Sequence, residues 1–308
     1  MNSLEISILE KGKILRKSLG ECLGFDFKKE RYTPYSIFKA RFLITQEIDE
    51  IVDVQVKISG VLVHKGLIDK MSITQKSDGK ILSISSRSYT SALGINVLAQ
   101  GVKYGVSLSH LVNECYEMPF IQTQEGYDKI CNYIYVKEHT SLWDVVVNMC
   151  MKLEGDYPYI RYANVVSFSK HNPMTVEFSH KNIVEHSDNV DNSKMISHIH
   201  MDDIDGNSNV YNLSNSYAIE RNIVRHRQSP FDRQWLNMSD IGLSHKINYT
   251  MRGVASEEIL YKGFRGEDIN DKFSYEKSEG KFISCVRIFG DENGIFTKLL
   301  AYKDAYCN

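Results

Sequence analysis

The sequence predicts an α+β protein that is mainly β, with a β-rich region at each end and an α+β insertion between them. Two observations indicate this class: apolar residues recur at every second position near both ends, and with a helical period in the middle. We place the first β-domain at residues 1–95, the insertion domain at 96–188 and the second β-domain at 189–308. With 308 residues, 42% of them hydrophobic and 25% charged, the chain is long enough to give such domains substantial cores.

The first β-rich region contains a half-buried strand and a hairpin. Apolar and polar residues alternate over 52–59, so we expect one face of this strand to pack on the core and the other to meet water. The stretches 71–75 and 80–85 flank the dipeptide Asp78-Gly79, which tolerates the positive φ of a tight turn. The sequence therefore predicts a β-hairpin around Asp78-Gly79.

Two helices are predicted in the insertion. Ser107 is the expected N-cap of the first, whose apolar face includes Cys115. Thr140 or Ser141 caps the second. Gly155 is expected to end this helix, because glycine accepts the left-handed conformation needed beyond the last turn.

Strand patterns return after the second helix. The stretches 159–162 and 165–168 indicate a short hairpin. A polar stretch at 187–193 precedes further strand-like segments at 210–213 and 282–288. The end of the chain is therefore expected to be β-rich, like its start.

The two β-rich ends share a sequence pattern. Residues 77–84 read Ser-Asp-Gly-Lys-Ile-Leu-Ser-Ile and residues 278–285 read Ser-Glu-Gly-Lys-Phe-Ile-Ser-Cys, while the stretch 64–73 is echoed in pieces between 261 and 275. Duplication of one β-domain around the insertion would explain this echo. Chance similarity between two hairpins is the alternative.

Common catalytic and nucleic-acid signatures are absent from the sequence. It contains no GxxxxGK[ST], GxGxxG, HExxH or GxSxG string, which argues against the usual phosphate-binding, dinucleotide-binding, zinc-protease and nucleophile-elbow sites. A formal net charge of −2 provides no general attraction to nucleic acid or an anionic membrane. The N-terminus lacks a signal-peptide pattern and the longest apolar runs are too short to cross a bilayer, so we expect the protein to be made and kept in the cytosol or to leave by lysis.

The segment from His198 to Asn207 is the richest polar cluster. On a strand, His198 and His200 would point to the same face, where they could hold a metal together with Asp202. A polar strand face that leads into a turn at Asp205-Gly206 is the favoured interpretation. We therefore assign no metal-binding residue.

The cysteines and tryptophans are expected to pack in the core. The six cysteines form no CxxC pair, and Cys115 and Cys150 lie on apolar helix faces, where core packing is favoured over a nucleophilic role. Trp143 lies on the second predicted helix, and Trp235 follows a loop-like stretch. Trp235 could form a platform for sugar or peptide, although a partly buried anchor is favoured. No catalytic or cofactor-binding residue is assigned.

The order of these motifs resembles the baseplate hub family of contractile phage tails and phage-tail-like bacteriocins, which includes proteins like late control protein D. In that family a strand pair ending in Gly-x-Ile/Val-Asp leads to a turn of the form Arg-Asp/Ser-x-Thr-x-x-Leu. Residues 66–69 (Gly-Leu-Ile-Asp) and 87–93 (Arg-Ser-Tyr-Thr-Ser-Ala-Leu) are similar to it. The segment 140–161 likewise resembles the helix that precedes the family's central hairpin.

The resemblance covers roughly residues 50–170 and has departures. Ser88 stands where the family often has an acidic residue, and residues 188–248 match no family pattern, which leaves the start of the second β-domain open. No lysozyme or peptidase extension follows, so a cell-wall-cutting activity is expected to belong to another chain.

What the resemblance implies is a structural protein and not an enzyme. Such hubs are trimers whose subunits each contribute two tube-like antiparallel β-barrel domains, so the ring joins a sixfold tail tube to a threefold central spike. The implied partners are two further copies, the spike, a tail tube or tube-initiator protein, other baseplate proteins and a tape measure protein, with no membrane and no sequence-specific nucleic acid. The implied location is the host cytoplasm during assembly and then the baseplate of the released phage or phage-tail-like particle.

Two other functions stay open within the same particle. A peptidoglycan-active enzyme would need a reactive site, for which His198, His200 and Asp202 are the first candidates. A glycan- or receptor-binding protein would use an exposed Trp235 and nearby tyrosines.

Overall fold

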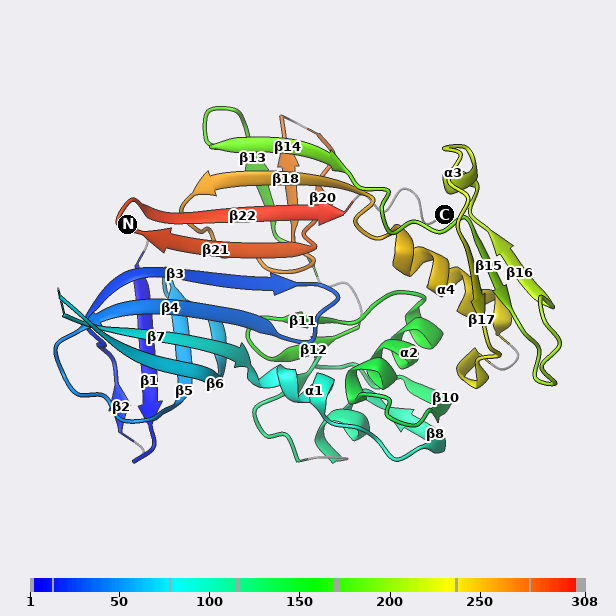
Figure 1. Ribbon diagram of the computed structural model, residues 1–308, viewed down its shortest axis with the longest axis horizontal. Helices are drawn as coiled ribbons and strands as arrows, with labels where there is room; N and C mark the ends of the chain where they lie inside the picture. Colours follow the sequence, from blue (N-terminus) through cyan, green and yellow to red (C-terminus); the bar gives the residue numbers. More distant parts are fainter. Residues whose placement is uncertain are drawn as a thin grey trace.

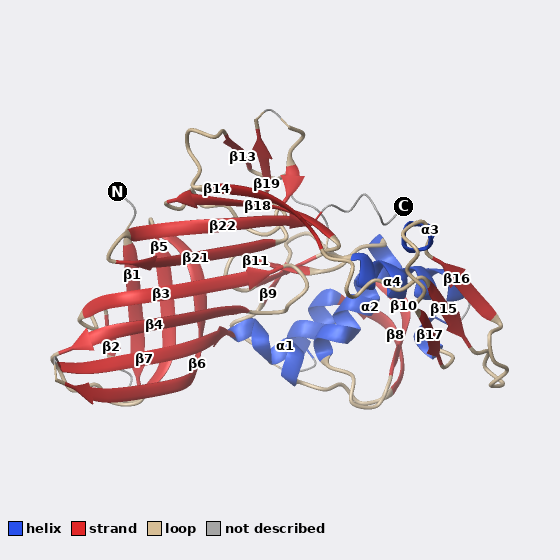
Figure 2. Cartoon of the chain, turned by 45° about the horizontal axis from the view of Figure 1, so that its top comes forward, coloured by secondary structure: helices blue, strands red, loops and turns tan. Residues whose placement is uncertain are grey.

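Strands dominate the molecule, and the mainly β, α+β class is confirmed (Figure 2). The computed structural model describes residues 3–12, 14–77, 79–114, 117–168, 172–235, 238–276 and 278–302. Figure 1 shows the N-terminal and C-terminal strands side by side, with most of the helices beyond one end of them.

Eleven strands form one antiparallel sheet to which both ends of the chain contribute. Strand β21 pairs with β3, with Val286 opposite Lys29 and Ile288 opposite Phe27. Among the described residues these pairings form one open sheet and close no barrel. In order across the sheet, the strands are β14 (Glu185–Val190), β18 (Ala255–Lys262), β22 (Gly294–Tyr302), β21 (Cys285–Asp291), β3 (Glu21–Glu30), β4 (Ser36–Ile44), β7 (Gly79–Ser88), β6 (Val61–Lys76), β5 (Ile51–Ile58), β1 (Leu4–Glu10) and β2 (Leu15–Arg16).

The large sheet curls around a core that both ends of the chain share. In Figure 1, β1, β5 and β6 cross behind β3, β4 and β7. Val54 and Ile58 on β5 are fully buried in the same core as Phe38 on β4 and Ile288 on β21. The alternation predicted for β5 is therefore confirmed, and it buries one face of the sheet.

The hairpin predicted between residues 71 and 85 is confirmed. Strands β6 and β7 pair up to Lys76 opposite Gly79, and Asp78 lies outside the described residues. The echoed segment also forms a hairpin, of β19 and β20, but its register differs. Phe273 pairs with Lys281, whereas Met71, which the echo matches to Phe273, pairs with Ile84. Duplication stays a prediction.

Outside the large sheet, short strands and a few helices complete the fold. The strands are β8 (Gly101–Ser107), β9 (Gln122–Thr123), β10 (Ile130–Val136), β11 (Tyr159–Arg161), β12 (Val165–Ser167), β13 (Thr175–Phe178), β15 (His198–Met201), β16 (Tyr211–Ser214), β17 (His226–Ser229), β19 (Lys272–Tyr275) and β20 (Lys281–Phe282). The α-helices are α1 (Ala92–Ile95), α2 (Leu142–Glu154), α3 (Ser216–Ile219) and α4 (Ser239–Met251), with 3-10 turns at Tyr89–Ser91 and Arg233–Trp235. In the described part of the chain, no helix has the length and apolarity needed to span a membrane.

The predicted second helix and the hairpin after it are confirmed. The Ser141 hydroxyl accepts from the Asp144 amide at the start of α2, and Gly155 ends the helix with φ 67°. Strands β11 and β12 pair as expected. The first predicted helix is present as a helical stretch that includes a π-helix at His110–Glu114, and the Ser107 hydroxyl accepts from the His110 amide as expected of its N-cap. Cys115 lies outside the described residues.

Part of the predicted insertion domain pairs with the C-terminal strands. Strand β14 pairs with β18 and β13 pairs with β19, although most of β14 and all of β13 precede residue 189. Between β14 and β18, strands β15 to β17 and helix α4 pack around a separate small core. The sequence pattern predicts no element at α4. The limits of independent domains stay a prediction.

Candidate interaction surface

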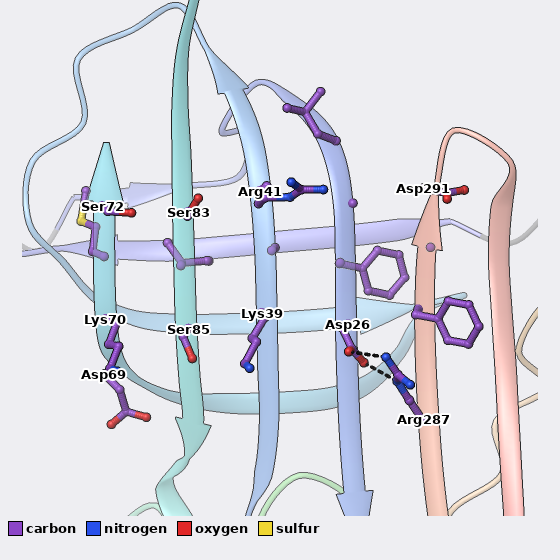
Figure 3. A pocket seen from close by; sticks show the side chains of 18 residues that line it. Asp26, Lys39, Arg41, Asp69, Lys70, Ser72, Ser83, Ser85, Arg287 and Asp291 are labelled. Atoms are coloured by element: carbon purple, nitrogen blue, oxygen red, sulfur yellow. Dashed lines mark hydrogen bonds and ion pairs between the residues drawn. The ribbon is translucent and has the colours of Figure 1, made fainter. Parts of the chain in front are cut away.

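An open groove of about 960 Å³ lies on the face of the large sheet that is turned away from its core (Figure 3). Strands β6, β7, β4, β3 and β21 cross beneath it. On β4, Phe38 and Ala40 are buried, which leaves Lys39 and Arg41 on the outer face. The two-residue period of the strands therefore places a row of polar side chains in the groove.

Two bidentate ion pairs brace the strands along the groove. Arg287 donates from Nε and Nη2 to the Asp26 carboxylate at 2.9 and 2.8 Å, and Arg87 donates to Asp69 at 2.8 and 2.9 Å. The hydrogen bond from Arg87 lowers the pKa of Asp69, and the bonds to the carboxylates raise the pKa of both arginines. Asp69, Arg87 and Arg287 therefore stay charged, and the bidentate geometry fixes the orientation of both pairs.

Three further cations in the groove have no carboxylate partner among the described residues: Lys39, Arg41 and Lys70. The lining has four cations against three carboxylates, and one of the cations, Arg287, is already paired. Unpaired cations on an open sheet face favour an acidic protein surface as partner.

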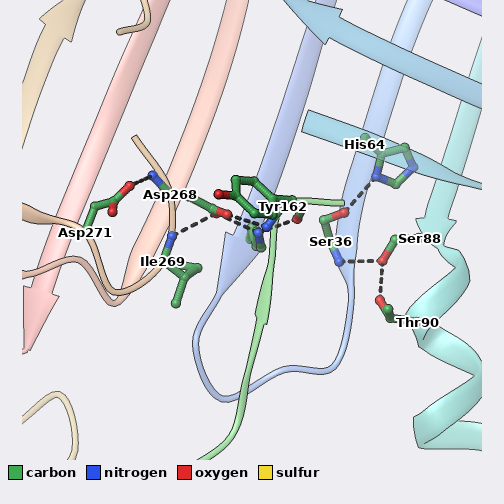
Figure 4. Close-up of polar contacts among 9 residues, drawn as sticks. Ser36, His64, Ser88, Thr90, Tyr162, Asp268, Ile269 and Asp271 are labelled. Atoms are coloured by element: carbon green, nitrogen blue, oxygen red, sulfur yellow. Dashed lines mark hydrogen bonds and ion pairs between the residues drawn. The ribbon is translucent and has the colours of Figure 1, made fainter. Parts of the chain in front are cut away.

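A buried ion pair joins the large sheet to the insertion (Figure 4). The Lys29 ammonium donates to Asp268 Oδ1 and to the Tyr162 carbonyl oxygen, both at 2.6 Å. Asp268 also accepts from the Tyr162 amide at 2.5 Å. Burial lowers the pKa of Lys29, and Asp268 opposes that shift. The pair therefore links β3, the turn between β11 and β12, and the loop before β19.

Several residues of the family-like motifs form a second buried network. His64 lies between the hydroxyl groups of Ser36 at 2.8 Å and Ser86 at 2.9 Å, and Figure 4 shows the bond to Ser36. Burial lowers the pKa of His64 to about 3, so its ring is neutral. Ser88 accepts from the Ser36 amide and shares a hydrogen bond with Thr90. These motif residues support the fold and are not part of the groove.

His198 and His200 lie together as the sequence predicts, but Asp202 does not join them. His198 and His200 lie on one face of β15, and His226 joins them because β17 pairs parallel to β15. His200 Nε2 lies 3.0 Å from His226 Nδ1. Asp202 instead accepts from the Gln228 amide at 2.5 Å. The sequence pattern missed His226, because only the parallel pairing of β15 and β17 brings it beside the other two histidines.

Among the described residues, one other cluster consists of side chains of the types that bind metals. His186, Asp188 and Glu257 bring donor atoms within 4.8 Å of one another. Lys281 already forms an ion pair with Glu257, and His186 Nε2 lies 3.1 Å from the same carboxylate. Because these contacts satisfy Glu257, the group fits an ion-pair cluster, and the absence of a metal site stays a prediction.

The remaining candidates are core residues. Cys150 is fully buried, and burial raises the pKa of its thiol, as expected for packing and not for a nucleophile. Trp235 is 1% exposed, so the interpretation as a sugar-binding platform is wrong and it is an anchor. It packs against Gly242 of α4, where a Cβ atom would collide with its ring. Trp143 is also buried.

Comparisons with known proteins identify the fold. No protein-family model matches the chain, and no curated protein sequence matches it. The 43 kDa tail protein of prophage MuSo2 from Shewanella oneidensis is 12% identical, with a TM-score of 0.74 over 98% of this chain and 99% of that one. The tail protein from Neisseria meningitidis MC58 is 13% identical, with a TM-score of 0.73 over 99% and 97%.

A chain of the half-lidded Francisella PdpA-VgrG complex is also similar, with 9% identity and a TM-score of 0.55 over 99% of this chain and 58% of that one. At these identities the similarity concerns the fold. The chain has the fold of phage tail proteins, which agrees with the resemblance seen in its sequence.

Proposed function

We propose that this chain is a structural component of a phage-type tail, and more specifically a trimeric baseplate hub that joins the sixfold tail tube to the threefold spike. The observation that carries the proposal is the similarity of fold to two phage tail proteins along nearly the whole of both chains. The motif order in residues 50–170 supports the hub as the particular component.

The edges of the large sheet support assembly with neighbouring subunits. Strand β14 stands at one edge and the two-residue strand β2 at the other, and neither has a second partner among the described strands. An edge strand has backbone N–H and C=O groups that a strand of another chain can pair with. In a trimer each β14 edge would be completed by a neighbour, while the groove would face a protein of a different kind.

Similarity to a chain of a PdpA-VgrG complex supports a spike as one of the partners. The further proposed partners are a tail tube or tube-initiator protein, other baseplate proteins and a tape measure protein. The chain would act in the host cytoplasm during assembly and in the released particle afterwards. The proposed role is structural. The burial of Cys150 and Trp235 and the hydrogen bond that Asp202 accepts from Gln228 support this role over the enzyme and the sugar-binding protein.

The mass of the purified protein in solution tests this proposal. One chain has a mass of 35.4 kDa, so light scattering should give about 106 kDa, three times that value, for the protein alone, or this mass plus that of the spike after mixing with the cognate spike protein. A monomer in both preparations would contradict the hub. Release of muropeptides from purified cell walls, lost on replacing His200 by Ala, would favour the enzyme instead.

A further inference from the structure

A pocket of about 340 Å³ lies where three parts of the chain meet, away from the groove. Tyr32 comes from the turn between β3 and β4, Trp143 from α2, and His245 and Tyr249 from α4. A volume near 300 Å³ is the lower end of the range for small-molecule sites. The pocket therefore has room for one small ligand or one side chain of a partner.

Arg252 contributes an uncompensated positive charge to this pocket. Its guanidinium lies 3.6 Å from the centre of the Tyr249 ring and 4.6 Å from that of Tyr32. Among the described residues its side chain forms no ion pair and no hydrogen bond. The two aromatic rings fix the plane of the guanidinium and leave its N–H groups free to bind an acceptor.

Two buried polar atoms beside Arg252 also lack partners. The Tyr157 hydroxyl oxygen and His245 Nδ1 are buried and form no hydrogen bond. The two rings are close, with 5.2 Å between their centroids. Burial raises the pKa of Tyr157 and lowers that of His245 to about 4, so Tyr157 remains a hydroxyl donor and His245 remains neutral. Buried polar atoms without partners are rare in folded proteins.

The other charged residues of the pocket are already bound. The Lys137 ammonium lies 2.9 Å from the Asp232 carboxylate. Asp144 accepts from the Ser141 hydroxyl at 2.6 Å at the start of α2. Of the two cations that line the pocket, Arg252 is therefore the one that lacks a counter-ion among the described residues.

We propose that this pocket binds a carboxylate group, with Arg252 as the bidentate donor and Tyr157 and His245 as further donors. A carboxylate matches the planar fork of a guanidinium. With its proton on Nδ1, neutral His245 donates one hydrogen bond, and Tyr157 donates another. The aromatic side chains of Trp143 and Tyr249 suit a ligand with an apolar body. Because the ligand would contact α2, α4 and the β3–β4 turn together, binding would hold these parts in one arrangement.

Calorimetric titration of the full chain with benzoate tests the proposal without any assembly. We expect saturable binding to the wild type, and binding about tenfold weaker or more in Arg252→Gln and weaker in Tyr157→Phe. Arg221→Gln is the matched control, since Arg221 also covers a tyrosine ring, that of Tyr217, but lies outside the pocket. It should bind benzoate like the wild type. Benzamide, which has the same shape and no charge, should bind at least tenfold more weakly.

The natural carboxylate could belong to a small molecule or to an acidic side chain of a partner, and a capped Gly-Glu-Gly peptide distinguishes these sources. Binding of the peptide with the same dependence on Arg252 supports a side chain, whereas binding of benzoate alone supports a small molecule. Arg252→Lys keeps the charge and guards against misfolding, and should bind with intermediate affinity. If neither probe binds the wild type, or if both bind Arg252→Gln equally well, the proposal is wrong. That result would leave the proposed hub function untouched.

Discussion

The large sheet has ion pairs in two settings that differ in burial more than in distance. At the junction with the insertion, Lys29 and Asp268 lie 2.6 Å apart with side chains 4% and 15% exposed. Across the groove, Arg287 and Asp26 lie 2.8 Å apart with side chains 46% and 39% exposed. Solvent screens the second pair and not the first, so the buried pair should determine whether the fold forms. Because Arg287 and Asp26 are partly exposed, a partner protein can still reach their charged groups.

Removing one member of the buried pair should have the largest effect. Lys29→Met leaves the Asp268 carboxylate without its counter-ion and the Tyr162 carbonyl without its donor, and should lower the free energy of unfolding by about 3–5 kcal/mol. Lys39→Met on the neighbouring strand is the control, since Lys39 is exposed, and should change it by about 0.5 kcal/mol or less. Urea denaturation of both variants measures the difference. Equal losses of unfolding free energy in the two variants would show that burial does not decide how much a lysine contributes to stability.

Acid should lower the free energy of unfolding through the buried residue His64. Because its pKa is about 3 in the fold and 6.5 in the unfolded chain, the unfolded chain binds the extra proton between these values. This contribution is present in full above pH 6.5 and falls by about 1.4 kcal/mol for each pH unit below it, until about pH 3. His64→Phe should therefore show a shallower loss of stability from pH 6 to pH 4 than the wild type, whatever its stability at pH 7. An unchanged slope would show that His64 takes up a proton within the fold.

The sequence predicts the regular part of this architecture and not the contacts between distant parts. The period of β5 and the caps Ser141 and Gly155 are local signals, and the elements that they predict are present. Helix α4 lacks such a signal, and its packing depends on Trp235 filling the space beside Gly242. The groove could not be predicted from the sequence, because it exists only where β21 pairs with β3. Asp26 and Arg287, which form an ion pair across these strands, are 261 residues apart in the sequence.

The family-like motif contributes to both settings, through the ion pair of Asp69 and Arg87 along the groove and through Gly66 between the paired strands, and Gly66 tests the second of these roles. A Cβ atom at Gly66 would collide with the Arg87 carbonyl oxygen on the paired strand β7. Gly66→Ala should therefore cost about 1–3 kcal/mol, the usual range for overpacking. Gly94→Ala is the control, since its Cβ would meet only the Pro34 side chain at an ordinary 3.5 Å. Thermal unfolding measures both, and a wild-type midpoint for Gly66→Ala would show that the strands can separate there at no cost.

The exposed setting should show the smallest change in stability and the clearest change in assembly. The double variant Lys39→Glu, Arg41→Glu reverses two unpaired charges on β4 without touching the core, so its free energy of unfolding should stay within about 1 kcal/mol of the wild type. If the groove receives an acidic partner, the same variant should fail to co-sediment with the other baseplate proteins at low salt, because like charges then face each other. Lys181→Glu, exposed and outside the groove, should assemble normally. Normal assembly of the double variant would exclude the groove as the partner surface, and the β14 edge would then be the surface on which assembly depends.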